Sequence, residues 1–133
     1  VDMPPGTGDT QLTFSQEIKM DGAIIVSTPQ EVALLDVKRG IKMFDKLGVK
    51  ILGLVDNMSY FNGDDGKKYK IFGEGGVKKT AEEFNKEFLG ELPIYPEVGK
   101  MGDEGKPIVE AKPDHDISKI FINFAEKIRD TYI

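Results

Sequence analysis

The segment "VDMPPGTGD" at residues 1–9 carries the residue types that nucleotide chemistry requires. An aspartate such as Asp2, placed at the end of a buried strand, can hold a water molecule bound to Mg²⁺. The prolines that follow restrict the backbone, and Gly6 and Gly8 leave backbone N–H groups able to face a γ-phosphate. The alternative is a proline-rich surface turn with an acidic side chain. The residues alone therefore indicate a candidate magnesium and phosphate site.

Asn57 is a second residue with a possible role in ligand binding. It lies in "VDNMSYF" at residues 55–61, directly after an apolar run with strand character. An asparagine at the carboxyl end of a strand, at the crevice of an open α/β sheet, can pair its amide with an adenine edge. An ordinary turn stabilised by the asparagine side chain is the simpler interpretation when Asn57 is viewed alone.

The glycine-rich stretch "FGEGGVKKT" at residues 72–80 has the appearance of a phosphate-binding loop. In a GxxxxGK(S/T) loop the second glycine lets the backbone close on the phosphates, and the lysine reaches their oxygens. Here Lys78 stands at the position of that glycine, and Glu74 adds a negative charge beside the supposed phosphates. We therefore predict a glycine turn that begins a helix.

Three apolar runs predict the strands that position these residues, namely residues 22–28, 49–55 and 88–94. The first two are β-branched or aliphatic almost throughout, as in strands that are covered on both faces of a parallel sheet. The third is weaker and is closed by Pro93.

Helical patterns separate and follow the strands, at residues 30–47, 76–86 and 116–132. Thr28 followed by Pro29 predicts the start of the first helix, and Gly48 predicts its end. Its predicted apolar stripe consists of Val32, Leu35, Ile41, Met43, Phe44 and Leu47. Asp114 or Asp116 is the expected cap of the last helix. Alternating strands and helices predict right-handed βαβ units in a three-layer α/β/α fold with a mostly parallel sheet, formed as a single domain by residues 1–133.

Composition excludes several classes of protein. The formal net charge of -5 argues against a nucleic-acid surface, because phosphate backbones require clustered Lys and Arg. No run approaches the roughly 20 apolar residues of a membrane span, and nothing has the pattern of a signal peptide, so we expect a cytoplasmic protein without membrane contact. With no cysteine, the chain by itself offers neither disulfides nor thiolate ligands.

Taken together and in order, the strings "DMPPGTGD", "STPQEVALLD", "NMSYF" and "LGELPI" closely resemble the carboxyl half of the Mrp/ApbC family. Members of this family are P-loop ATPases of the MinD/ParA type and are regarded as iron–sulfur cluster carriers. The resemblance covers nearly the whole chain. It implies a partial P-loop NTPase domain, MinD-like in fold, that lacks the half with the Walker A loop.

The resemblance also implies roles for individual residues. Asp2 matches the aspartate on the magnesium side of the family's ATP site, and Pro5, Gly6 and Gly8 match its switch loop. Asn57 matches the asparagine that recognises adenine. Pro93 falls in the loop on the base side, which is a weaker match. In the intact protein, ATP and Mg²⁺ would then lie at the carboxyl ends of the strands, between two protomers of a homo-oligomer.

Two departures from the family pattern limit these expectations. The 133 residues contain no Walker A loop, so we expect the chain alone to bind ATP weakly and not to hydrolyse it. Family members commonly carry a CxxC pair after "NMSYF", whereas this chain has "NGDDG" at residues 62–66, which predicts a hairpin turn. The cysteine ligands of an iron–sulfur cluster are thus absent from this segment, although iron–sulfur client proteins remain expected partners of the intact protein.

Two other functions remain open on the sequence. One is a positioning or partition ATPase of the MinD/ParA kind, which the missing cysteines favour. The other is a non-catalytic interaction module that associates with longer relatives.

Overall fold

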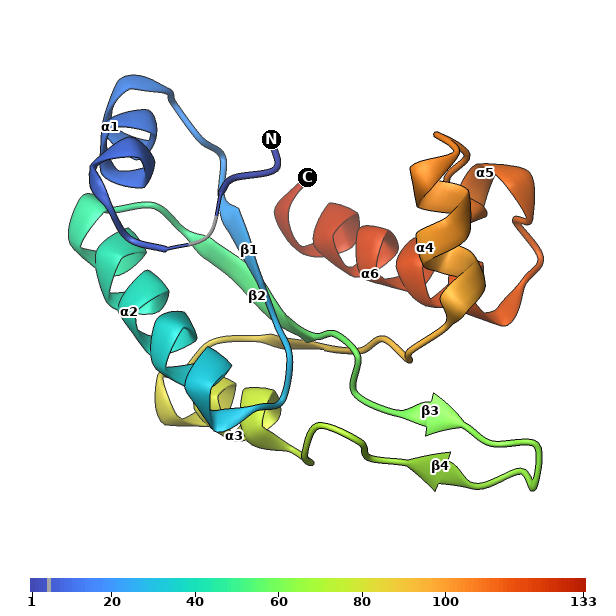
Figure 1. The fold of residues 1–133 in the computed structure, drawn as a ribbon. Helices are drawn as coiled ribbons and strands as arrows, with labels where there is room; N and C mark the ends of the chain where they lie inside the picture. Colours follow the sequence, from blue (N-terminus) through green and yellow to red (C-terminus); the bar gives the residue numbers. More distant parts are fainter. Residues whose placement is uncertain (5) are drawn as a thin grey trace.

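A parallel three-stranded sheet forms the centre of the chain (Figure 1). The computed structural model describes residues 1–4 and 6–133. The strands are β1 (Ala23–Ser27), β2 (Ile51–Asp56) and β5 (Phe88–Glu91), in the order β1-β2-β5. The three predicted strands and their parallel pairing are confirmed.

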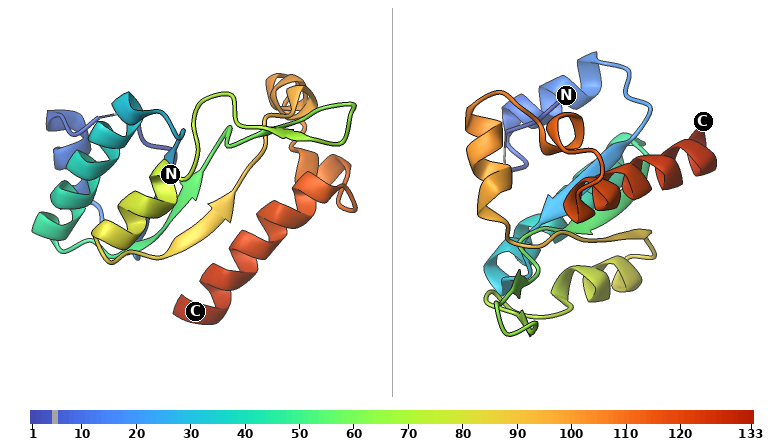
Figure 2. Two further views of the ribbon diagram at one scale, coloured as in Figure 1. Left: turned by 90° about the horizontal axis from the view of Figure 1, so that it is seen from below. Right: turned by 90° about the vertical axis from the view of Figure 1, so that its right-hand side faces the viewer.

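Helices cover both faces of this sheet (Figure 2). α2 (Glu31–Leu47) and α3 (Gly76–Glu83) lie on one face, and α6 (Asp116–Tyr132) lies on the other. The larger core, between the sheet and α2 and α3, consists of Val37, Ile41, Met43, Phe44, Ile51, Leu54, Val77 and Ala81. The smaller core, under α6, consists of Val55, Leu89, Leu92 and Phe124. The three-layer α/β fold predicted from the sequence is confirmed.

β1 is an edge strand, since among the described residues it pairs only with β2. Its residues Ile24 and Val26 point to the face that α6 covers farther along the sheet, and both are exposed to solvent. The edge and this uncovered strip lie along the same open groove, which is described below.

α2 differs from its prediction at its first turns. It begins at Glu31 with Gln30 as its N-cap, so the prediction of a start at Thr28 and Pro29 was wrong by two residues. Gly48 ends the helix with a left-handed φ of 71°, as predicted. Val32 and Leu35 are 71% and 57% exposed, and their assignment to the buried stripe was wrong. At about 100° per residue, Val32 lies opposite Ile41, and Leu35 lies about 120° around the helix from it.

Three helices were not predicted, namely α1 (Asp9–Glu17), α4 (Pro96–Asp103) and α5 (Ile108–Ala111). None contains a buried apolar stripe, and α5 is only four residues long. Apolar periodicity therefore could not reveal them. Of the helices described, none has the length and apolar character needed to cross a lipid bilayer.

The segment "NGDDG" forms the tip of a hairpin, as predicted. β3 (Phe61–Asn62) and β4 (Lys68–Tyr69) pair in antiparallel fashion on either side of it. Asp65 stabilises the turn, because its Oδ1 accepts the backbone N–H of Lys67 at 3.0 Å and its Oδ2 accepts the hydroxyl of Tyr69. These two hydrogen bonds hold the pKa of the Asp65 carboxyl below its ordinary value.

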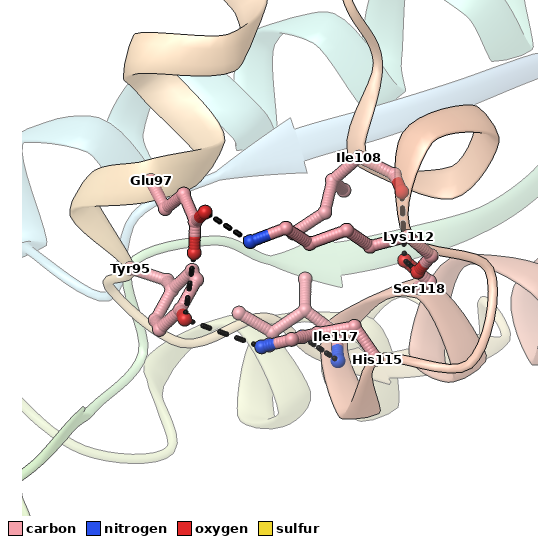
Figure 3. Close-up of polar contacts among 7 residues, drawn as sticks. All are labelled: Tyr95, Glu97, Ile108, Lys112, His115, Ile117 and Ser118. Carbon is pink, nitrogen blue, oxygen red and sulfur yellow. Dashed lines mark hydrogen bonds and ion pairs between the residues drawn. The ribbon is translucent and has the colours of Figure 1, made fainter.

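His115 connects the loop after β5 to the start of α6 (Figure 3). The backbone N–H of Ile117 donates to His115 Nδ1 at 3.2 Å, so His115 caps α6 and the expectation of Asp114 or Asp116 as the cap was wrong. Because Nδ1 accepts, the neutral ring carries its proton on Nε2, which lies 3.2 Å from Tyr95 Oη. Tyr95 in turn donates to Glu97, which is ion-paired with Lys112. This chain of contacts joins α4, α5 and α6.

We expect His115→Ala to lower the free energy of unfolding by about 1–2 kcal/mol, because it removes both the helix cap and the contact with Tyr95. His115→Asn should recover most of the loss, since asparagine is a good N-cap. Urea denaturation would measure both changes. Asp114→Ala, at the exposed neighbouring position, is the control and should change little; an equal loss there would contradict the assignment of the cap.

Candidate functional site

Three polar side chains lie side by side where the parallel strands end. Ser27 of β1 pairs with Asp56 of β2, and Asp56 pairs with Glu91 of β5. Residues paired in register point to the same face of a sheet, so the three side chains form one row. Ser27 and Asp56 are buried, and Asp56 is 0% exposed. The carboxyl edge of the sheet, where open α/β folds bind ligands, is thus polar in its interior.

The turn that carries Asn57 follows directly and is fixed on both sides by backbone hydrogen bonds. The N–H of Asn57 donates to the carbonyl of Ser27 at 2.7 Å. The N–H of Ser59 donates to Leu92 at 2.9 Å, and the N–H of Ile94 donates to Tyr60 at 2.7 Å. These bonds hold the turn beside the segment that contains Pro93. The structure therefore brings Asn57 and Pro93 to the same end of the sheet.

The side chain of Asn57 takes part in the turn without losing its capacity for recognition. Its Oδ1 accepts the backbone N–H of Met58 at 2.9 Å, and Met58 has a left-handed φ of 55°. An amide oxygen has two lone pairs, and the amide nitrogen donates twice. One acceptor position and the NH₂ group thus suffice for a donor and acceptor pair such as the edge of a base requires.

Asp56 is the functional candidate that the sequence interpretation missed. Burial raises the pKa of its carboxyl from 3.8 to about 6, and the negative charge of Glu91 adds to this effect. Lys70 and a hydrogen bond from Ser59 Oγ, 3.5 Å from Oδ2, act in the opposite direction. Within the described part of the chain, Oδ1 has no hydrogen-bond partner. The sequence did contain a feature that could have identified Asp56, because this carboxylate is the last residue of an otherwise apolar strand.

The amino-terminal segment lies against a different part of the sheet. An open groove of about 980 Å³ runs along β1 and α2, and its lining includes Asp2, Gly6, Ser27 and Thr28. Gly6 has a positive φ of 101°, and Gly8 is the N-cap residue of α1. Pro5, predicted to belong to the switch loop, lies outside the described residues.

The predicted site residues therefore form two groups. Asp2 and Gly6 share the groove, Asn57 and Pro93 share the carboxyl edge, and Ser27 contributes to both places. Figure 1 shows the amino terminus near the end of the sheet at which β1 begins, whereas the turn with Asn57 follows the other end of β2. Asp2 is thus not brought next to Asn57, and the roles of Asp2, Gly6 and Gly8, like those of Asn57 and Pro93, stay predictions.

The glycines of residues 73–76 serve helix packing. Gly73 has a φ of 117°, and a Cβ there would lie 3.3 Å from the carbonyl oxygen of Pro29. A Cβ on Gly76 would lie 2.6 Å from Leu34 Cδ1. α3 begins at Gly76, so the predicted glycine turn at the start of a helix is confirmed. The glycines allow α3 to approach the beginning of α2 closely.

Donor chemistry distinguishes the two inorganic groups expected from the resemblance. The chain has no cysteine, and among the residues described no three His, Cys, Asp or Glu side chains gather as a metal site. These residues do not fit an iron–sulfur cluster, which requires thiolates. A carboxylate such as that of the exposed Asp2 is the type of ligand that Mg²⁺ takes beside phosphates and water.

The parallel sheet between helix layers, with a polar carboxyl edge, is the arrangement of a doubly wound α/β protein that binds ligands at its strand ends. A profile described as "ParA: NUBPL iron-transfer P-loop NTPase" matches residues 1–129. The chain belongs to this family.

Curated relatives agree with that assignment. An "Iron-sulfur cluster carrier protein" of Synechocystis is 48% identical over 130 residues, which cover 96% of this chain and 37% of that protein. One from Aquifex aeolicus is 44% identical over 127 residues, 95% of this chain and 35% of that protein. The "Iron-sulfur cluster transfer protein NUBPL" of Dictyostelium discoideum is 48% identical, covering 96% and 40%. The chain thus spans about two fifths or less of the length of these relatives.

Solved structures support the same fold. A nucleotide-binding protein from Archaeoglobus fulgidus, in complex with ADP, has a TM-score of 0.72 and 40% identity, covering 84% of this chain and 46% of that one. The MinD cell division protein of Aquifex aeolicus has a TM-score of 0.69 at 20% identity, covering 93% and 49%. The latter similarity concerns the fold alone.

Proposed function

We propose that this chain forms the base side and switch-loop side of the nucleotide site in an iron–sulfur cluster carrier ATPase. One observation carries the proposal: Asn57 lies at the carboxyl edge of a parallel sheet, in a turn fixed to Ser27 and to the segment before Pro93. In this proposal Asn57 recognises adenine and the segment around Pro93 flanks the base. Asp2 holds water on Mg²⁺, while the backbone of Pro5, Gly6 and Gly8 faces the γ-phosphate.

The similarity to the relatives supports a wider function. Bound ATP and Mg²⁺ would supply the energy and the two states of a nucleotide switch, and the cargo would be an iron–sulfur cluster delivered to client proteins. Because these 133 residues include no cysteine, the ligands of that cargo would come from other polypeptide segments. We propose a cytoplasmic homo-oligomer as the working form.

A MinD-type positioning ATPase is the second candidate. The fold is compatible with it, but the MinD structures are 20–24% identical to this chain, whereas the named carriers reach 42–48%. Identity at the level of the carriers favours cluster transfer as the function.

Titration of the ¹⁵N-labelled chain with Mg²⁺-ADP, followed by nuclear magnetic resonance, tests the proposal. We expect amide shifts at Asn57, Ser59 and Leu92, with Asn57→Ala weakening the apparent affinity about tenfold through loss of a paired amide contact. Asn62→Ala, in the exposed hairpin, is the matched control and should bind as the unaltered chain does. Shifts centred on residues 75–80, or equal affinity of the two variants, would contradict the proposal.

A further inference from the structure

The row of side chains at the carboxyl edge contains two carboxyl groups on adjacent strands, of which Asp56 is buried and Glu91 is partly exposed. Asp56 and Glu91 are paired in register, so their side chains point to the same face of the sheet. Asp56 is fully buried and lies directly before Asn57, while one of its oxygens has no partner in the described part of the chain. A buried carboxylate and a neighbouring, partly exposed one repel each other unless a cation or a proton intervenes.

Lys70 provides that cation. Its Nζ lies 3.5 Å from Glu91 Oε2, and both side chains are partly buried. Lys70 is the first residue after β4, so it lies at the base of the hairpin. Lys68 and Lys70 also lie over the ring of Tyr60, at 4.3 and 5.4 Å from its centre. The hairpin is thus fastened to the carboxyl edge at Glu91 and at Tyr60.

We infer that Asp56 is a positioning residue for the turn that carries Asn57, and that Lys70 is the counter-ion that allows Asp56 to hold this turn beside Glu91. The inference rests on the proposed function, because it assigns a regulator to the same nucleotide site. Asp56 itself contacts no nucleotide in this assignment. It acts through the geometry of the turn.

The hairpin and the turn with Asn57 are coupled because the carboxylate and the neutral acid of Asp56 form different hydrogen bonds. As a carboxylate, Asp56 accepts a hydrogen bond from the hydroxyl of Ser59, and this bond joins the two ends of the turn that carries Asn57. As a neutral acid, it carries a proton on one of its oxygens and is a weaker acceptor for the hydroxyl of Ser59. Displacement of the hairpin removes Lys70 and favours the neutral acid, which alters the bond to Ser59. The hairpin and the turn with Asn57 are linked in this way.

Few other charges act on this site. In the described structure, Glu91 of β5 and Lys70 after β4 are the charged groups that act on Asp56. Burial, and after it the charge of Glu91, raises the pKa of the Tyr60 phenol in the same turn, while Lys70 acts in the opposite direction. Ser27, on the other neighbouring strand, is neutral. Within residues 1–4 and 6–133, Lys70 is therefore the one cation in the link between the hairpin and the turn with Asn57, and its replacement tests that link.

The test is a titration of the Asp56 carboxyl carbon by nuclear magnetic resonance in the chain without nucleotide. Lys70→Met should raise the titration midpoint of Asp56 by about one pH unit, and at pH 7 it should shift the amides of Asn57 and Ser59. Lys68→Met is the matched control, because Lys68 shares the contact with Tyr60 but makes no ion pair with Glu91. It should leave the midpoint unchanged.

Two further variants separate charge from folding. Lys70→Arg should restore the original midpoint, and Glu91→Gln should lower it, because a repelling charge is removed. An Asp56 midpoint that moves equally in Lys68→Met and Lys70→Met, or that does not respond to Glu91→Gln, would overturn the inference. Since the measurement needs no nucleotide, failure of the proposed function would leave these outcomes intact, and the two failures are distinguishable.

Discussion

Replacement of Gly90 by alanine is expected to lower the free energy of unfolding by about 2–5 kcal/mol. Gly90 lies within β5 and has a φ of 144°, a backbone conformation that side chains with a Cβ rarely adopt. A Cβ at this position would lie 2.8 Å from Cε1 of Phe124, which packs from α6 into the smaller core. Strain in the backbone and overlap with the ring therefore add, and urea denaturation measures their sum.

Gly99→Ala is the matched control for this prediction. Gly99 lies in α4, and a Cβ there would meet nothing within 4 Å. Alanine should therefore raise stability slightly, as expected for an open helical position. Phe124→Leu introduced together with Gly90→Ala should relieve the overlap but not the backbone strain, and so recover part of the loss. Equal stability of Gly90→Ala and the unaltered chain would show that β5 does not adopt this conformation.

Asp56→Asn is expected to stabilise the chain at pH 7 by up to about 3 kcal/mol. The side chain is fully buried, and the pKa of its carboxyl is about 6 in the folded chain, compared with an ordinary value of 3.8. Each unit of difference corresponds to about 1.36 kcal/mol. Asparagine has the same shape and no charge, so it removes the cost of burying a carboxylate beside Glu91.

The expected pH dependence has a definite sign. Between pH 4 and 6 the folded chain retains a proton on Asp56 that the unfolded chain has lost. The contribution of Asp56 to stability is therefore most favourable below about pH 4, declines as the pH rises to about 6, and is level above that. The difference between Asp56→Asn and the unaltered chain should grow over the same interval.

Denaturation midpoints at several pH values would measure this difference. Asp64→Asn, at the exposed tip of the hairpin, is the control and should show no comparable divergence. A constant difference between Asp56→Asn and the unaltered chain from pH 4 to 7 would contradict the assignment of the raised pKa.

Much of the fold could be predicted from the sequence because its largest elements have strong local signals. β1 and β2 are continuous apolar runs, and α6 places its apolar residues on one stripe. α4 and α5 depend instead on the contacts of Tyr95, Glu97 and Lys112 with each other and with His115. The contacts of Lys112 with Glu97 and of His115 with Tyr95 join residues 15 and 20 positions apart, so they are not visible as a local sequence pattern.

The candidate site was predictable where a role follows from position along one strand. Asn57 was placed correctly at a carboxyl edge because it directly follows an apolar run. Asp56 was missed because its significance depends on Glu91, 35 positions later, and on the register between β2 and β5. Register between strands is not visible in a single sequence. The cap at His115 was missed for a different reason, because aspartate is the commoner N-cap residue and two aspartates flank this histidine.

The free edge of β1 affects how the proposed phosphate side of the site could be assembled. Its outer backbone groups and the exposed Ile24 and Val26 adjoin the same groove that Asp2 and Gly6 line. An additional strand laid along β1 would widen the sheet and confine the amino-terminal loop in a single step. Growth of the sheet and confinement of Asp2, the proposed magnesium-side residue, would then be one event, whereas the turn with Asn57 already has its backbone hydrogen bonds to Ser27 and Leu92.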